Sequence, residues 1–426
     1  MDLLPQLLAL VQADDLVAVQ AWLEPRPGWL FRVGRHSGAS MAGALGRVRT
    51  PAMAELLVDH GLDLAVVSAA WASGIGLGAI PGPVAERWVA RGATLSVHAA
   101  AALGLIGPLR ELLDAAPDQV GAPGGDGCHP LHFARTVAVA ELLLERGAEL
   151  DARDDDHDST PAQWRIGEAP DVTRFLLQRG ATPDLFMAAG LGDEALARRM
   201  VAAHPECTTD RIGNNSGPFP GIGFQGRGGT IYQWTLGFNQ SPQEIAWARG
   251  HRAIFDFLMS RTPPRAAFLI ACAMADRVRA EDILARHSGL RAELTGEDLA
   301  LLAKCCWETN LNPAAVRLML DLGFPVAVPE HNHGFLPLHN AAWCGHAGLV
   351  ELLLQRGHPV DVRDPQHQGT PLDWALHSCV QAGRHPEGEF ARVLTLLLAA
   401  GATVAPGRFP TGRADLDDVL RAVQRP

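Results

Sequence analysis

The sequence predicts an all-α solenoid of about twelve stacked helix-turn-helix units. The first observation is internal self-similarity: the prolines that open corresponding segments lie 31 residues apart at Pro130 and Pro161, and 34 apart at Pro337 and Pro371. The second is that each such segment ends in a Leu-Leu pair shortly followed by glycine. The third is composition, because 426 residues that are 47% hydrophobic suffice for a large core and exclude wholesale disorder.

The clearest units form two adjacent pairs. Gly127–Asp154 is followed by Ser159–Asp184, and Gly334–Asp364 is followed by a unit that begins at Gly369 and ends in LLLAAGATV. Each unit contains a proline, a short helix, a polar turn and a second helix. Proline in the first turn of a helix costs no hydrogen bond, and Ser or Thr before it can cap the helix.

Small residues complete the pattern. Ala341 and Ala342 would let neighbouring helices approach closely. A glycine after the second helix can take the left-handed conformation that ends it. Because a single helix pair cannot bury its apolar face, the units must stack. The glycines in this position are Gly147, Gly180, Gly323, Gly357 and Gly401.

These segments resemble the ankyrin repeat, whose pattern is roughly G-x-T-P-L-H-x-A-A, then G-H, then V-x-L-L-L-x-x-G-A. The resemblance is strong over 127–184 and 334–402 and implies a solenoid covering nearly the whole chain. Weaker copies are expected at Met41–Gly61, Ser96–Ala115, Leu185–His204, Ser241–Arg261, Phe268–His287 and Asp298–Gly323. We divide the chain into degenerate helical repeats (1–93), ankyrin repeats (94–210), a Gly-rich insert (211–240), and further ankyrin repeats with a C-terminal helical cap (241–426).

Three departures from the repeat pattern matter. The units at 127–154 and 159–184 are short between their helices, so their first helices are expected to be clipped. The unit that begins at Gly369 carries an insertion containing HSCVQAGRHPEGEF. Residues 211–240 contain eight glycines and the only tyrosine, Tyr232. Alternation over 230–236 predicts a short strand or hairpin there. The glycines at 221–229 lack the strand-to-helix context of a dinucleotide-binding loop.

The stretches STPAQW, GGTIYQWTLG and GTPLDWALHS are similar to a group of long bacterial ankyrin proteins with the same insert. This resemblance implies no particular activity.

Charge and composition exclude several classes of function. Thirty-six basic and 47 acidic residues give a net charge of −11, which argues against a general nucleic-acid or anionic-membrane binder. Seven cysteines without CxxC spacing favour a reduced, cytoplasmic protein. The N-terminus lacks the positive region of a secretory signal. The uncharged run 64–85 is interrupted by glycine and proline, so we expect two short helices and no membrane span.

The concave groove of the array supplies the candidate site. The histidine of the TPLH motif normally bonds neighbouring backbone, so His132 and His339 are expected to be structural, and Asp373 replaces this histidine in its unit. Residues just after that position face the groove in ankyrin-like units. Together with two insert aromatics they give the candidate binding residues Tyr232, Trp234, Trp307, Glu308, Trp343, Trp374 and His377.

Two interpretations of this aromatic set remain open. The groove and the insert could enclose a pocket, with the insert as a lid, or the aromatics could simply pack against the insert. The acidic run 154–158 could hold a metal, but its spacing matches no calcium loop. We therefore expect a solvated turn in which Asp158 caps the next helix. His367 and the histidines at 331 and 333 are expected to be surface residues, and no metal or cofactor is predicted.

The leading functional hypothesis is a protein-binding scaffold or adaptor that uses the concave groove and the insert. The alternative is an enzyme or small-molecule receptor, in which His377 acts as acid or base and Glu308 is its charge partner. An enclosed pocket beneath the insert would favour the alternative. An open groove with exposed aromatics would favour a protein partner.

Overall fold

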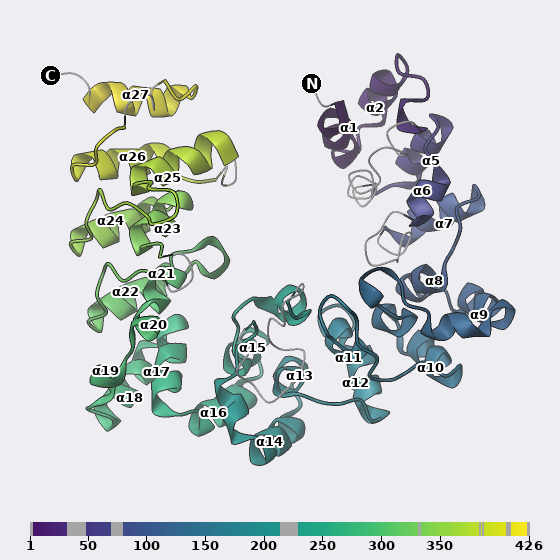
Figure 1. Ribbon diagram of the computed structural model, residues 1–426, viewed down its shortest axis with the longest axis horizontal. Coiled ribbons are helices and arrows are strands. Elements are labelled where there is room, and N and C mark those ends of the chain that lie inside the picture. The colour runs from purple at the N-terminus through teal and green to yellow at the C-terminus, as the bar shows by residue number, and fades with distance from the viewer. Residues whose placement is uncertain are drawn as a thin grey trace. The chain divides into compact units, whose positions relative to one another are not determined.

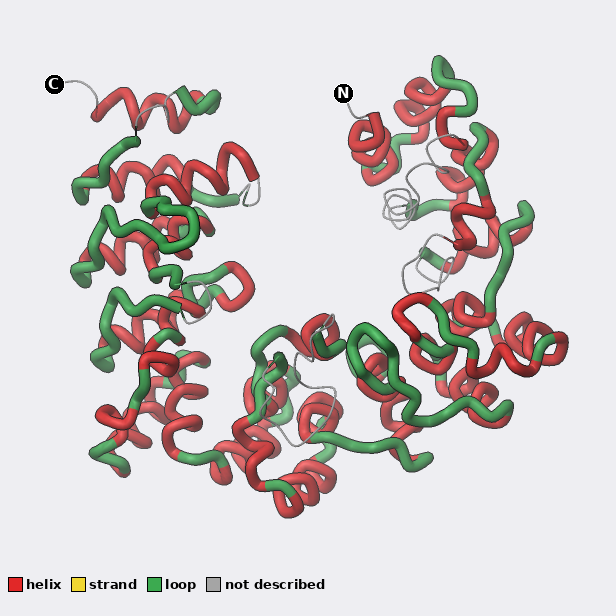
Figure 2. The backbone as a smooth tube through the Cα atoms, viewed as in Figure 1, coloured by secondary structure: helices red, strands yellow, loops and turns green. Residues whose placement is uncertain are grey.

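The structure is a computed structural model that describes residues 3–31, 48–69, 80–213, 229–330, 334–382, 385, 387–405 and 410–423. Helices are the only extended regular elements in these ranges (Figures 1 and 2). The chain divides into two compact units, residues 1–258 (the N-terminal unit) and 259–426 (the C-terminal unit). These two units are compact bodies and do not correspond to the predicted domains. The predicted domain boundaries after residues 93, 210 and 240 therefore stay a prediction.

The N-terminal unit consists of helix pairs stacked side by side. The first helices of successive repeats contact one another, as α8, η4 and α11 do, and the second helices α9, α10 and α12 form a parallel layer behind them. The helices are α1 (Leu3–Gln12), α2 (Leu16–Leu23), α5 (Pro51–Asp59), α6 (Leu64–Ala69), α7 (Gly82–Ala90), α8 (Val97–Leu103), α9 (Ile106–Ala115), η4 (Pro130–Phe133), α10 (Val137–Glu145), α11 (Pro161–Arg165), α12 (Pro170–Gln178), α13 (Leu185–Leu191), α14 (Glu194–Ala203) and α15 (Pro242–Ala248).

The C-terminal unit repeats this arrangement. Helices α21, α23 and α25 form one layer, and α22, α24 and α26 form the other. The unit boundary falls within α16 (Arg252–Arg261). The remaining helices are α17 (Pro264–Ala273), α18 (Arg277–Arg286), α19 (Leu290–Glu293), α20 (Gly296–Leu299), α21 (Leu301–Lys304), α22 (Pro313–Asp321), α23 (Pro337–Trp343), α24 (Ala347–Gln355), α25 (Pro371–Leu376), the π-helical η8 (His377–Ala382), α26 (Phe390–Ala399) and α27 (Ala414–Val423).

The repeat signals act as the sequence predicts. Thr160 and Thr370 each cap a helix that begins with proline, and each takes part in a reciprocal capping box. The glycines at 180 and 401 have φ of 101° and 95° and lie just beyond the second helices. Ala341 is fully buried between neighbouring helices. The shortened units do have clipped first helices: η4 is a four-residue 3₁₀ turn and α11 has five residues, against seven in α23.

The short strand predicted over 230–236 is wrong. Residues Gln233–Gly237 form a single π-helical turn, η6. The ends of the insert are nevertheless paired, because the Ile212 amide donates to the Gln240 carbonyl (3.0 Å) and the Asn239 amide donates to the Ile212 carbonyl (3.1 Å). Positive φ at Gly237 and Asn239 turns the chain back to make this closure. Residues 214–228, which include most of the insert glycines, lie outside the described residues.

Two further predictions concern a possible membrane span in the apolar run 64–85 and the state of the cysteines. Helices α6 and α7 occupy the two ends of the run 64–85, and residues 70–79 between them are not described. Within the described ranges, no helix is both long and apolar enough to cross a membrane. All seven cysteines are buried, and none of them forms a disulfide bond.

Candidate functional site

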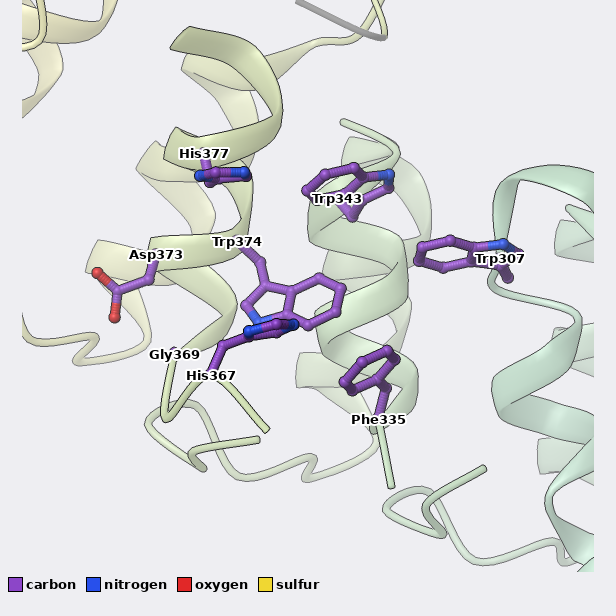
Figure 3. Close-up of a pocket in the computed structure, with 8 residues that line it drawn as sticks. All are labelled: Trp307, Phe335, Trp343, His367, Gly369, Asp373, Trp374 and His377. Carbon is purple, nitrogen blue, oxygen red and sulfur yellow. The ribbon is translucent and has the colours of Figure 1, made fainter. Parts of the chain in front are cut away.

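The candidate site is a row of aromatic rings on the first-helix layer of the C-terminal unit (Figure 3). Trp307 follows α21, Trp343 ends α23 and His377 follows α25. The ring centroids of Trp307 and Trp343 are 6.2 Å apart with an interplanar angle of 16°, and those of Trp343 and His377 are 5.8 Å apart at 25°. Three successive repeats thus contribute one stacked ring each, as the repeat register predicts.

Trp374 forms the floor beneath this row. Its ring is buried and meets Trp343 edge-on, with centroids 5.6 Å apart. Phe335 lies against the other side of Trp374 at 4.5 Å. The floor is therefore fixed by packing, whereas Trp307 and Trp343 are half-buried and His377 is exposed.

These rings border a surface pocket of about 420 Å³, which we call the groove pocket. Four of the predicted residues line it, and the other four lining residues were not predicted to do so. Phe335, His367 and Gly369 lie in the loops that precede α23 and α25, and Asp373 lies within α25. The lining residues are Trp307, Phe335, Trp343, His367, Gly369, Asp373, Trp374 and His377.

A buried carboxylate organises the loop at the pocket edge, residues 364–370, which we call the C-terminal fingertip loop. Asp364 Oδ1 accepts from the amides of Gln366 (3.0 Å) and His367 (2.6 Å). Its Oδ2 accepts from the Gly369 amide (2.8 Å) and from Trp374 Nε1 (3.0 Å). Burial acts to raise the pKa of Asp364, but these hydrogen bonds to the charged form together lower it below its usual value.

The TPLH histidines are structural, as predicted. His132 Nε2 lies 3.2 Å from the Ser159 carbonyl oxygen, and His339 Nε2 lies 3.1 Å from that of Gly369. Each histidine therefore ties its repeat to the fingertip loop of the next. Burial lowers the pKa of His132 to about 4 and also lowers the pKa of His339, so both rings are neutral near pH 7.

The groups proposed for catalysis are arranged differently from the expectation. Glu308 Oε2 lies 3.0 Å from His385 Nε2, so His385, from the insertion before α26, contacts Glu308 in place of the predicted His377. Cys344 is buried, which raises the pKa of its thiol to about 12, and its Sγ donates to the Cys306 carbonyl at 3.7 Å. A protonated, buried thiol is a poor nucleophile.

The insert aromatics belong to the N-terminal unit and do not line the groove pocket. Tyr232 is fully buried against Phe186 (ring centroids 5.6 Å apart) and donates its hydroxyl to Asp184 Oδ2 at 2.6 Å. It is therefore a core residue rather than a pocket wall, because its hydroxyl finds a buried acceptor in its own unit. Trp234 is 75% exposed. The predicted lid falls largely on residues 214–228, outside the described ranges, and stays a prediction.

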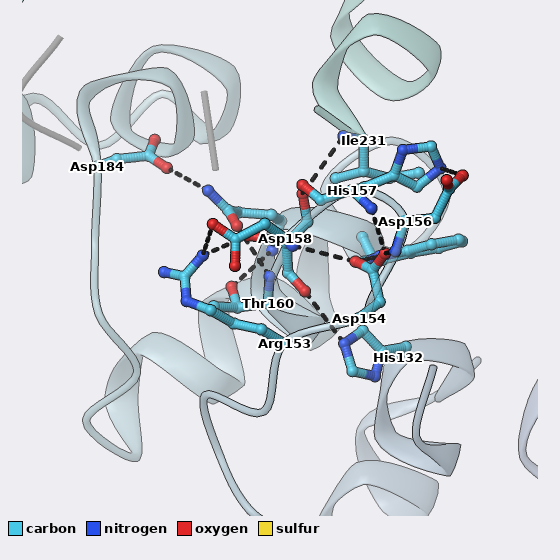
Figure 4. Close-up of polar contacts among 12 residues, drawn as sticks. His132, Arg153, Asp154, Asp156, His157, Asp158, Thr160, Asp184 and Ile231 are labelled. Atoms are coloured by element: carbon cyan, nitrogen blue, oxygen red, sulfur yellow. Dashed lines mark hydrogen bonds and ion pairs between the residues drawn. The ribbon is translucent and has the colours of Figure 1, made fainter. Parts of the chain in front are cut away.

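A second fingertip loop, residues 154–160, lies in the N-terminal unit and contains the acidic run (Figure 4). Asp154 accepts from the amides of Asp156, His157 and Ser159, and from Trp164 Nε1 at 2.9 Å. The prediction that Asp158 caps the next helix is wrong, because Thr160 caps α11 and Asp158 has a left-handed φ of 48°. Among the residues that the structure describes, no His, Cys, Asp and Glu cluster could hold a metal ion.

Comparisons with known proteins agree with this architecture. The family model described as "Ankyrin repeat" matches residues 126–155, and the one described as "Ankyrin repeats (many copies)" matches residues 319–375. No curated protein matches the chain.

Similar solved structures are also ankyrin repeat domains. That of Bcl-3, described as a unique member of the IkappaB protein family, shares 19% identity over 57% of this chain and 99% of that one, with a TM-score of 0.33. That of human ASB11 shares 19% identity over 72% of this chain and 99% of that one, with a TM-score of 0.23. The two family matches fall on units with the repeat's characteristic helix pairs and histidine bonds, and they identify residues 126–155 and 319–375 as ankyrin repeats.

Proposed function

We propose that this protein is a scaffold or adaptor that binds a protein partner through the aromatic row of its C-terminal unit. Ankyrin repeats generally mediate protein–protein interaction. The observation that carries the proposal is the stack of Trp307, Trp343 and His377, whose rings are held in register by three repeats, with His377 exposed and both tryptophans half-buried. Rigid aromatic rings lose little conformational entropy on binding, and tryptophan is enriched among residues that dominate interface energies.

The insert offers a second candidate contact surface within the N-terminal unit. Trp234 is 75% exposed and Phe238 is 46% exposed, although they follow the deeply buried Tyr232 by two and six residues in the sequence. Large apolar side chains held at the surface by a rigid anchor fit a partner-binding role. The net charge of −11 favours a partner with a basic or mixed-charge surface.

A small-molecule receptor is the second candidate, and the groove pocket is the observation that favours it. Its volume of about 420 Å³ and its aromatic walls are typical of ligand sites. Against a catalytic version of this candidate, Glu308 contacts His385 rather than His377, and burial raises the pKa of the Cys344 thiol. The pocket is also open beside the exposed His367 and His377, which suits a partner segment better than an enclosed substrate.

Native mass spectrometry on protein gently enriched from its host lysate tests the proposal. We expect a stoichiometric protein companion that is lost in a Trp343→Ala variant and retained in Trp247→Ala, which truncates a part-exposed tryptophan of the N-terminal unit. A bound mass of a few hundred daltons that is lost only in Trp343→Ala would instead establish the small-molecule receptor. Circular dichroism on both variants must show unchanged helicity.

A further inference from the structure

The groove pocket is the second copy of a surface that the chain itself occupies in the N-terminal unit. We infer that the pocket binds a short peptide segment, through contacts equivalent to those by which residues 229–237 lie on the N-terminal copy. The inference rests on the proposed function, because it names the chemistry of the partner segment. It follows from three comparisons between the two copies.

The first comparison is the sequence of the two fingertip regions. Residues 151–164 and 361–374 share the pattern D-x-R-D-x-x-H-x-[SG]-T-P-x-x-W. The first aspartate has the same role in both, because the Asp151 carboxylate accepts from the amide and hydroxyl of Thr182, and the Asp361 carboxylate accepts from those of Thr403. The shared pattern therefore describes one structural element used twice.

The second comparison is the geometry of the aromatic floor. In each copy the second aspartate accepts the tryptophan Nε1 hydrogen, at 2.9 Å from Trp164 and 3.0 Å from Trp374. In each copy the ring of the fingertip histidine also lies next to that tryptophan, in a tilted arrangement. The centroids of His157 and Trp164 are 5.7 Å apart at 52°, and those of His367 and Trp374 are 6.2 Å apart at 57°. A phenylalanine also meets the tryptophan edge-on in both copies, but from different repeat positions, because Phe133 follows the histidine of its TPLH-like motif and Phe335 precedes the proline of its own by two residues.

The third comparison is whether a chain segment covers the surface. In the N-terminal copy, the end of the insert lies on it. His157 Nδ1 is 3.1 Å from the Gly229 carbonyl oxygen, which can only accept, so Nδ1 is the donor. The Ile231 amide donates to Ser159 Oγ at 3.3 Å (Figure 4). Farther along, Gly167 lies so close to Thr235 that a Cβ there would be 3.2 Å from the Thr235 carbonyl oxygen.

The residues that hold the insert map onto the residues that line the pocket. By the shared pattern, His157 corresponds to His367 and Ser159 to Gly369, and Gly167, three positions after the shared tryptophan, corresponds to His377. All three C-terminal counterparts line the groove pocket. The pocket is therefore the place where an equivalent segment would lie.

The differences between the copies define the ligand. His367 retains the ring that bonds a backbone carbonyl, whereas Gly369 lacks the hydroxyl that accepts from the Ile231 amide in the other copy. His377 in place of Gly167 prevents the close backbone approach made by Thr235, and its ring instead extends the stack with Trp343. We therefore expect a peptide that presents one backbone carbonyl to His367 and an apolar or aromatic side chain to Trp343 and Trp374.

Peptide selection on the intact protein tests this inference. A random library of nine-residue peptides displayed on phage is selected against the immobilised full chain, and the consensus peptide is synthesised with a fluorescent label. Anisotropy titrations then compare wild type with His367→Ala, His367→Asn and Trp343→Ala. Matched controls are His287→Ala, an exposed histidine of the same unit, and His157→Ala, the counterpart in the N-terminal copy.

We expect His367→Ala to weaken the peptide by about tenfold, and Trp343→Ala by at least as much. His367→Asn should recover most of the loss, because its amide nitrogen can replace Nδ1 as the donor to a carbonyl. Both control variants should bind within about twofold of wild type, a change under 0.5 kcal/mol. His367 is exposed, so its variants do not endanger folding.

Three results would overturn the inference: no enriched peptide, a consensus peptide that binds His367→Ala as tightly as wild type, or one that is lost in His157→Ala. These results leave the proposed function intact if a protein companion is still lost in Trp343→Ala, since a folded surface could then contact the aromatic row. If native mass spectrometry showed no protein companion but the peptide selection succeeded, the function would be restricted to binding short segments.

Discussion

At the scale of single residues, the pair Asp184 and Tyr232 anchors the insert to the repeats. Asp184 caps α13 through the Met187 amide (2.8 Å) and also accepts from Gln163 Nε2 (3.3 Å) and the Tyr232 hydroxyl (2.6 Å). Burial raises the pKa of both the Asp184 carboxyl and the Tyr232 hydroxyl. A buried polar group of this kind is stable only while its partners remain.

Replacing Tyr232 by phenylalanine removes one of these partners and little volume. We expect Tyr232→Phe to lower the free energy of unfolding by about 1–3 kcal/mol, because a buried acceptor loses a donor. Urea unfolding followed by circular dichroism measures the change. The neighbouring Trp234→Ala, at an exposed position, should change stability by less than about 0.5 kcal/mol. Equal effects of the two substitutions would contradict the anchoring role.

Gly167 is a second residue whose identity the insert dictates. A Cβ at this position would lie 3.1 Å from Thr235 Cβ and 3.3 Å from its Cα. We expect Gly167→Ala to displace the 229–237 segment at a cost of about 1–3 kcal/mol, as overpacking does elsewhere. Gly107→Ala in α9 is the matched control, because nothing lies within 4 Å of its added Cβ, and helix propensity there favours alanine.

The measurement that separates these glycine variants is hydrogen exchange of the insert amides. The Thr235 amide, which donates to the Ile231 carbonyl at 3.1 Å, should exchange faster in Gly167→Ala. The same amide should be unaffected in Gly107→Ala. If Gly167→Ala left both stability and Thr235 exchange unchanged, the 229–237 segment would not be packed against Gly167 as described.

At the scale of elements, each fingertip loop is held by one carboxylate. The loop at 364–370 has no repeating backbone ladder of its own, so Asp364 satisfies the amides of Gln366, His367 and Gly369 in its place. The Asp364 carboxylate that shapes this loop also orients Trp374, because its Oδ2 accepts the indole hydrogen. Loop geometry and the floor of the groove pocket are thus coupled through one residue.

Removing that carboxylate should disrupt both. We expect Asp364→Ala to cost about 2–5 kcal/mol, because several buried donors are left unsatisfied. Asp154→Ala should cost a similar amount in the N-terminal unit if the two loops are equivalent. His367→Ala alters the same loop only in an exposed side chain, so its effect should stay within about 0.5 kcal/mol. Urea unfolding at pH 7 measures all three variants.

At the scale of the whole molecule, buried neutral histidines make stability depend on pH. Burial lowers the pKa of His132 in the N-terminal unit and of His358 in the C-terminal unit, each to about 4 from 6.5. Between these two values the unfolded chain binds the extra proton and the folded chain does not. Stability is therefore full above the unfolded pKa of 6.5 and decreases as the pH falls toward 4.

Each of these histidines should remove about 2 kcal/mol of stability between pH 7 and pH 5. Urea unfolding at the two pH values tests this, and the His132→Gln variant should show a pH dependence smaller by about that amount. His287→Gln, at an exposed position, serves as the control and should leave the pH dependence unchanged. An identical pH dependence in wild type and His132→Gln would show that the pKa of His132 is the same in the folded and the unfolded chain.

The fold and part of the candidate site could be predicted from the sequence, and both predictions succeeded for the same reason. Proline positions, caps and the glycines that end helices act within one repeat, so Pro161, Thr160 and Gly180 specify their local structure directly. Repeat register also places Trp307, Trp343 and His377 on one layer, because equivalent positions of stacked repeats face the same way. Phe335 and His367 lie in the connecting loops, whose direction no helical period defines, although the pattern shared by 151–164 and 361–374 could have identified His367.

The helix pairs, their clipped members, the structural histidines and the aromatic row were predictable from the amino-acid sequence, because each follows from local propensity or from the repeat. The structure was needed to show that Tyr232 donates to Asp184, that Glu308 contacts His385, and that the insert end lies on one fingertip loop. Those contacts join residues far apart in the sequence, where loop paths and the competition among buried partners, rather than any periodic signal, determine which groups meet.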